Sequence, residues 1–165
     1  MQPALQGEPH YQQHRIVINI NPGENVGTET AKKPAVLFVC SKNGGKSQLA
    51  VGLMRQLAAG SVDVYSAGTK PGKDLNPLAV ESLTELGIDV TGEHPKPVTD
   101  DVIDAVDVVV VLGTEAKLEP RDGTRFELWE TDEPSERGIE GMERMRLVRD
   151  DIKSRVQQLY STLAR

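Results

Sequence analysis

The sequence predicts a single α/β domain in which a four-stranded parallel sheet lies between layers of helices. Two apolar runs, residues 35–39 and 107–113, have the length and the β-branched composition of strands that are buried on both faces. Shorter strands are expected at residues 62–67, where apolar and polar residues alternate, and at residues 126–129. Segments with helical periodicity separate the strands, and this alternation is typical of a parallel sheet with helices on both faces.

The helical segments are marked by apolar periodicity and by end signals. They are expected at residues 47–59, 76–86, 99–105 and 142–163. Asn76 and Thr99 are expected to cap the second and third helices. Pro77 is expected to open the first turn of the second helix, while Gly60 and Gly87 follow the ends of the first and second helices. Residues 131–141 are expected to form a loop before the long C-terminal helix.

Composition excludes several classes of function. The chain has 165 residues, enough for one domain with a real core, and a net charge of −6, which argues against a general binder of nucleic acids or membrane surfaces. No apolar run approaches the about 20 residues of a membrane-spanning helix, and the polar start of the chain does not predict a signal peptide. The single cysteine excludes an internal disulfide, so we expect a reducing, cytoplasmic location.

Residues 1–33 are expected to form an N-terminal arm that precedes the domain at residues 34–165. Within the arm, residues 14–20 alternate and indicate a strand that adds to a sheet edge, in its own subunit or in a neighbour's; an unstructured tail is the alternative. The sequence therefore leaves open a monomer or a homodimer formed through the arm. His10 and His14 lie four residues apart without further ligands, so no metal site is expected.

The segment from the first strand into the first helix carries the candidate chemistry. Cys40 ends the strand, and a loop with Gly44 and Gly45 leads into the helix. A strand, a glycine-containing loop and a helix N-terminus direct backbone N–H groups and the positive end of the helix dipole at one point, which favours an anion. Lys42 and Lys46 add positive charge, and such surroundings favour the thiolate, the nucleophilic form of cysteine. The alternative is an inert cysteine buried at a strand end.

The pattern Cys40-x5-Lys46-Ser47-Gln48 resembles the Cys-x5-Arg-Ser loop of the low-molecular-weight protein tyrosine phosphatases and of the arsenate reductases built on the same fold. The stretches 66–69 and 76–89 are also similar to that family. The resemblance covers residues 35–165 and implies a flavodoxin-like, three-layer fold. Lys46 stands where the family has arginine, and a lysine offers one mobile charge in place of a bidentate fork. This difference is expected to weaken phosphatase chemistry more than chemistry on arsenate, which is a more labile oxyanion.

The resemblance also implies roles for individual residues. The implied oxyanion-binding residues are Ser41, Lys42, Asn43, Gly44, Gly45, Lys46 and Ser47. Asn43 is expected to hold the shape of the loop or to occupy a left-handed turn, and both are compatible. Ser47 is expected to donate a hydrogen bond to the thiolate or to cap the helix. Trp129 is expected in the core.

A proton donor for the departing oxygen is implied at the loop after the last strand, where the family has an aspartate directly before a proline. Here Glu133 matches that acid by position, because it precedes Pro134, and Asp132 matches it by residue type. The alternative for both is a solvated acidic loop.

The presence of a single cysteine determines which type of arsenate reductase mechanism is expected. The thioredoxin-coupled arsenate reductases carry further redox cysteines at the positions of Gly45 and approximately Gly113, and this chain has neither. The resemblance thus implies the arsenate–mycothiol transferase type: Cys40 and its loop bind arsenate, an external small thiol such as mycothiol forms an arseno-thiol adduct, and a mycoredoxin or glutaredoxin-like protein reduces it to arsenite. No tightly bound cofactor is implied. A tyrosine phosphatase and a non-catalytic oxyanion sensor remain the alternatives.

Overall fold

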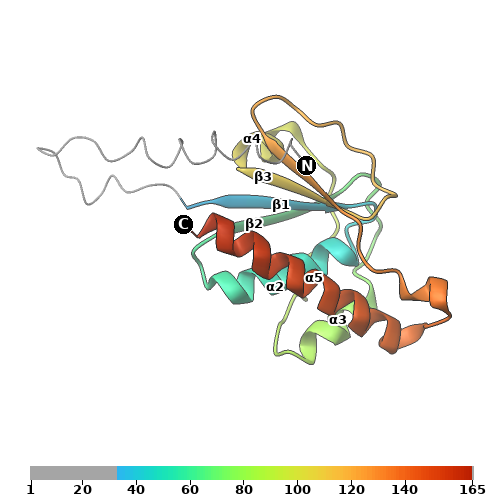
Figure 1. Ribbon diagram of the computed structural model, residues 1–165. Coiled ribbons are helices and arrows are strands. Elements are labelled where there is room, and N and C mark those ends of the chain that lie inside the picture. Colours follow the sequence, from blue (N-terminus) through green and yellow to red (C-terminus); the bar gives the residue numbers. More distant parts are fainter. Residues whose placement is uncertain (1–32, 165) are drawn as a thin grey trace, which may run out of the picture.

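The computed structural model describes residues 33–164 of the chain. The expected N-terminal arm, including the strand proposed at residues 14–20, lies outside the described residues. Figure 1 shows a central sheet with helices packed along one face. Within the described part of the chain, none of the helices is both long and apolar enough to cross a membrane.

The sheet has four parallel strands, as the sequence predicts, and their order is β2-β1-β3-β4. The strands are β1 (Ala35–Cys40), β2 (Asp63–Gly68), β3 (Val108–Leu112) and β4 (Arg125–Trp129). Every residue of β1 and β3 is buried, which explains their unbroken apolar sequences. β2 and β3 pair with opposite sides of β1, and the chain crosses from one side to the other between them, so the carboxyl end of β1 is a switch point, where ligands of such sheets bind.

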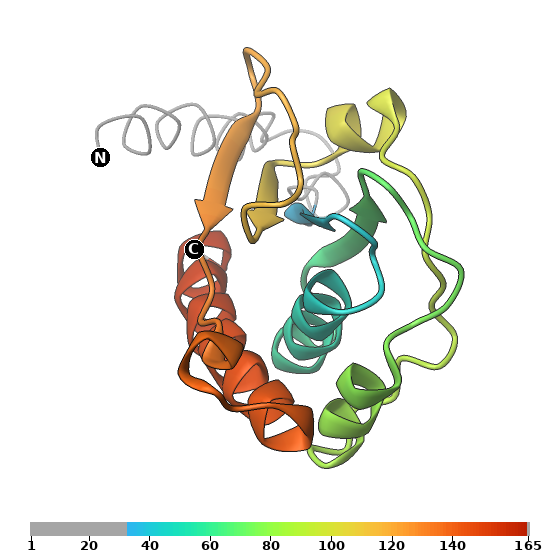
Figure 2. The ribbon, with the colours of Figure 1, turned by 90° about the vertical axis from the view of Figure 1, so that its right-hand side faces the viewer.

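Helices cover the two faces of the sheet unequally (Figure 2). The helices α2 (Lys46–Ala58), α3 (Pro77–Thr84) and α5 (Gly141–Leu163) lie on one face, where α5 contacts both α2 and α3. The short helix α4 (Asp100–Ala105) lies on the other face against β1. The expected caps form, since Asn76 Oδ1 accepts from the N–H of Leu78 at 2.9 Å and Thr99 Oγ1 accepts from that of Val102 at 3.2 Å.

The strand side chains divide the core into two clusters because successive residues point to opposite faces. Val36, Phe38 and Val110 belong to the larger cluster under α2 and α5, which also holds the buried Trp129, as expected. Leu37, Val39, Val109 and Val111 belong to the smaller cluster on the α4 side.

One expectation needs correction. Residues 131–141 are not loop throughout, because a 3-10 helix, η2 (Pro134–Arg137), interrupts them. Pro134 opens this turn with a fixed φ, and Gly138 ends it with a φ of 83°. A single turn of four residues has no periodicity, so the sequence gives no signal for it.

Candidate active site

Cys40 is the last residue of β1 and lies at the switch point of the sheet. Cys40 is 7% exposed. Its Sγ lies 3.0 Å from the Oγ of Ser47, a residue in the first turn of α2. Asn43 Nδ2 donates a hydrogen bond to the same hydroxyl oxygen at 2.8 Å. As a thiol, Cys40 donates to Ser47 Oγ, and Asn43 donates to the same oxygen. The hydroxyl of Ser47 carries its own proton, which it can turn toward the sulfur when Cys40 reacts as a thiolate. Ser47 does not cap the helix: the N-cap residue is Gly45, with no side-chain cap.

Asn43 fixes the shape of the loop in both of the expected ways. Its backbone has a φ of 57°, in the left-handed region that asparagine tolerates, and its side chain is fully buried. Besides the bond to Ser47, its Oδ1 accepts from the N–H of Lys96 at 3.0 Å and its carbonyl accepts from Gln48 Nε2 at 3.0 Å. The loop is therefore bonded to α2 and to a distant segment of the chain.

A second group of residues, Gln48, Ser66 and Lys96, lies next to Asn43, and the other two side chains both contact Ser66. Gln48 Nε2 and Lys96 Nζ each lie 3.4 Å from Ser66 Oγ. Gln48 is fully buried, and its Oε1 has no hydrogen-bond partner among the described residues. Sequence reasoning missed Lys96, because it lies in a proline-containing loop 53 positions from Asn43 and carries no local signal. Ser66 lies in the stretch 66–69, and the resemblance of that stretch to the family was the sequence signal that could have identified Ser66 as a site residue.

Two glycines are required for the close approach of these loops. A Cβ on Gly68, which pairs with Cys40, would lie 2.7 Å from the carbonyl oxygen of Ser41. A Cβ on Gly44 would lie 2.9 Å from the carbonyl oxygen of Asp74. Both distances are shorter than real Cβ contacts, so only glycine fits without backbone movement. Gly45 differs, since the nearest atom to a Cβ there would be 4.0 Å away.

The loop after Cys40 presents unused backbone N–H groups. Its carbonyls turn toward the segment after β2: those of Ser41, Lys42 and Gly44 accept from the N–H groups of Lys70, Gly72 and Asn76 at 2.8–3.0 Å. Within the described part of the chain, the N–H groups of residues 41–47 donate to no protein acceptor. They leave a cradle of donors at the N-terminus of α2, which is the arrangement that binds a tetrahedral oxyanion.

Lys46 and Glu133 face each other across the mouth of the site. The Lys46 ammonium forms an ion pair with Glu133 Oε2, and their side chains are 17% and 30% exposed. Arg144 Nη2, on α5, lies 3.6 Å from the other oxygen of Glu133. Lys46 Nζ also lies next to Gly113, where a Cβ would be 3.1 Å from it. Residues that follow β1, β3 and β4 are thus brought together at one end of the sheet.

The two candidate acids occupy different surroundings. Arg137 holds Asp132 in a bidentate ion pair, with distances of 2.8 and 3.2 Å from its two terminal nitrogens to the two carboxylate oxygens. This hydrogen-bonded pair lowers the pKa of Asp132, and backbone donation from Glu133 also favours its ionised form. A general acid needs the opposite tendency. The structure brings Glu133 to Lys46 and leaves Asp132 with Arg137.

A groove opens directly beside the cradle, with a volume of about 730 Å³. Lys42 and the two loop glycines form one wall, and the segment 70–78 forms the other. Lys70, Lys73 and Asp74 lie on that second wall, so together with Lys42 the lining carries more positive than negative charge, although the whole chain is negatively charged. Its volume is within the range of about 300–1,000 Å³ for small-molecule sites.

Comparison with known proteins agrees with this geometry. A glutaredoxin arsenate reductase of Synechocystis is 33% identical over 132 residues, which cover 78% of this chain and 98% of that protein. Arsenate reductase 1 of Staphylococcus haemolyticus is 33% identical over 136 residues, with coverage of 79% and 98%. Among solved structures, a thioredoxin-dependent arsenate reductase of Corynebacterium glutamicum superposes with a TM-score of 0.70 at 29% identity, covering 99% of this chain and 71% of that one. Residues 35–165 match the family described as low molecular weight phosphotyrosine protein phosphatase, and the chain belongs to that family.

Proposed function

We propose that the chain is an arsenate reductase in which Cys40 is the nucleophile and an external small thiol supplies the second sulfur. The observation that carries the proposal is the placement of the single cysteine, 3.0 Å from Ser47 Oγ, at a cradle whose N–H groups have no acceptor among residues 33–164. The similarity to named arsenate reductases supports arsenate as the oxyanion.

In the first step, the N–H groups of residues 41–47 and the Lys46 ammonium bind the arsenate oxygens. The Cys40 thiolate attacks As(V), an S–As bond forms, and one As–O bond breaks. Glu133 provides the proton for the departing oxygen, which leaves as water. Glu133 is the proposed donor because it lies beside Lys46 of the cradle loop, whereas Asp132 is paired with Arg137 and contacts no residue of that loop.

In the second step, the external thiol attacks arsenic and displaces Cys40, which returns as the free thiol. The product is a small-thiol–As(V) adduct. A thiolate of a redoxin then attacks the sulfur of this adduct, and the electron pair of the S–As bond passes to arsenic, giving arsenite and a mixed disulfide. Two thiols are oxidised to one disulfide and As(V) is reduced to As(III), so the electrons balance without a second cysteine in this chain.

The groove beside the cradle supports a small thiol as the second reactant. It has room for a molecule of that size next to Lys42 and the loop glycines. The resemblance of the loop implies mycothiol, with a mycoredoxin or glutaredoxin-like protein as the reductant, and these are the first partners to test.

The test is arsenite release measured in parallel with mycothiol plus mycoredoxin, with glutathione plus glutaredoxin, and with a thioredoxin system alone. We expect turnover only where a small thiol and a redoxin are both present. The Cys40→Ser variant is the control, and it is expected to release no arsenite above background. Full turnover with thioredoxin and no small thiol would overturn the proposed mechanism, and activity of the control would overturn the assignment of Cys40.

A phosphatase is the second candidate, because the family match itself is to phosphotyrosine phosphatases. Lys46 argues against it, since phosphoryl transfer depends on donors fixed at the equatorial oxygens and a lysine paired with Glu133 offers one mobile charge. Hydrolysis of an aryl phosphate at a rate above that of arsenate reduction would favour this candidate.

A further inference from the structure

The two edges of the sheet are used differently by the rest of the molecule. At the β2 edge, Gly68 exchanges backbone hydrogen bonds with the segment 96–98, and Arg55 donates to the carbonyl of Val64 at 2.9 Å. At the opposite edge, β4 pairs with β3, and the described residues supply no backbone partner to its outer side. The outer N–H and C=O groups of β4 are therefore available to pair with a further strand.

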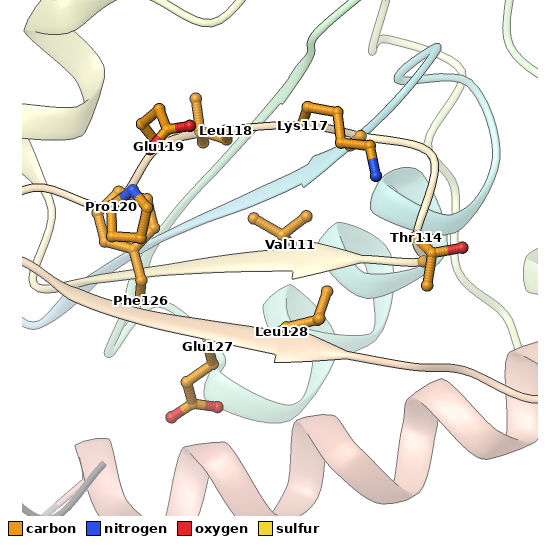
Figure 3. A pocket seen from close by; sticks show the side chains of 11 residues that line it. Val111, Thr114, Lys117, Leu118, Glu119, Pro120, Phe126, Glu127 and Leu128 are labelled. Carbon is orange, nitrogen blue, oxygen red and sulfur yellow. The ribbon is translucent and has the colours of Figure 1, made fainter. Parts of the chain in front are cut away.

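An apolar groove lies beside this free edge, on the face of the sheet that α4 leaves uncovered (Figure 3). It has a volume of about 460 Å³ between the loop after β3 and the strands β3 and β4. Its apolar side chains are those of Val111, Ala116, Leu118, Pro120, Phe126 and Leu128. Leu128 is 56% exposed although it lies in a strand, which is the largest exposure of any large hydrophobic residue in the described part of the chain. The edge and the groove together form one surface that suits an apolar strand.

The chain itself contains a segment with the required pattern. Residues 14–20, His-Arg-Ile-Val-Ile-Asn-Ile, place Ile16, Ile18 and Ile20 on one face of a strand. The other face carries Arg15, Val17 and Asn19. This division matches β4, because Phe126 and Leu128 lie on the groove side while Arg125 and Glu127 point to the opposite, polar side.

The length and the attachment point of the preceding residues allow this contact within one chain. Residues 21–32 connect the segment to the described part, and at about 3.3 Å per residue they reach up to about 40 Å. The start of β1 and the start of β4 lie at the same end of the parallel sheet, two strand spacings or about 10 Å apart. An antiparallel orientation on β4 needs the shortest connection, and tethering gives the segment a high effective concentration at its own edge.

We propose that residues 14–20 add to the free edge of β4 of their own chain as an antiparallel fifth strand, with the three isoleucines covering the groove at Leu128. The occupant is the segment of this chain, not a second copy, because the connection spans the distance with length to spare. The proposal is independent of the arsenate chemistry, since no residue of the contact belongs to the cradle.

Hydrogen exchange on the full-length chain tests the contact without truncation. Ile18→Asp removes an apolar contact on the groove face, and Val17→Asp is the matched control on the other face of the same segment. We expect Ile18→Asp to accelerate exchange of the outward-pointing amides of β4 about tenfold or more, while Val17→Asp has a smaller effect. Equal exchange in the parent and in Ile18→Asp would overturn the proposal.

Cross-linking identifies the edge and the chain. In a Cys40→Ser background, Ile18→Cys is combined with Leu128→Cys on β4 or with Tyr65→Cys on β2, and a short bis-maleimide is added to dilute protein. We expect an intramolecular cross-link to position 128 and little to position 65, with mass spectrometry assigning the peptides. A cross-link between two chains would show that a second copy occupies the edge, and preference for position 65 or no cross-link would show that the segment does not bind β4; each result overturns the proposal.

Discussion

The hydroxyl of Ser47 contacts both Cys40 and Asn43, and we expect its removal to lower the reaction rate and the folding stability. Ser47→Ala removes the oxygen that lies 3.0 Å from Cys40 Sγ and 2.8 Å from Asn43 Nδ2. A hydrogen bond to a charged group contributes about 1.5–3 kcal/mol, so loss of thiolate stabilisation corresponds to a rate about 10-fold to 150-fold lower. The buried amide of Asn43 also loses an acceptor, which costs about 1–3 kcal/mol of folding stability.

The assay is single-turnover arsenite formation with saturating small thiol, together with thermal unfolding. Ser82→Ala is the matched control, because Ser82 is equally buried and its hydroxyl donates to the carbonyl of Ala79 at 2.9 Å, away from the site. We expect both variants to lose stability and only Ser47→Ala to lose rate. A Ser47→Ala enzyme with the parent's rate would refute the argument that this hydroxyl stabilises the thiolate.

Three further predictions follow from the site. Lys46→Arg restores a bidentate donor, so aryl phosphatase activity should rise above that of the parent in a chromogenic assay; no rise would mean that the side chain points away from the bound oxyanion. Glu133→Gln should lower the arsenate rate by about 10²–10⁴-fold, while Asp132→Asn should change it little; equal losses would reject Glu133 as the sole donor. Gly44→Ala should lower the melting temperature more than Gly45→Ala, because a Cβ at Gly44 meets a backbone carbonyl at 2.9 Å and one at Gly45 meets nothing closer than 4.0 Å; the reverse order would contradict the steric account.

The fold was predictable because its strongest signals are local. The apolar runs of β1 and β3 are buried throughout, and the caps at Asn76 and Thr99 form where the sequence placed them. The parallel pairing of the strands also agrees with the alternation of strands and helices, while their order comes from the structure alone.

The site was predictable in part. The segment from Cys40 to Ser47 is contiguous, so its residues were found together by sequence. The contacts that complete it join distant positions: Lys96 reaches Asn43 across 53 residues and Glu133 reaches Lys46 across 87. Glu133 and Asp132 are adjacent in a loop and carry the same sequence signal, and the fold shows that Glu133 faces Lys46 while Asp132 faces Arg137.

The unused N–H groups of residues 41–47 have a consequence for the evolution of this site. Every amino acid except proline supplies the same amide, so the donors of the cradle are encoded by the path of the chain and not by side-chain identity. Glycines and Asn43 specify that path, while the side chain at position 46 adds one charge that Glu133 already balances. An exchange between arginine and lysine at position 46 therefore leaves the backbone donors of the anion site in place.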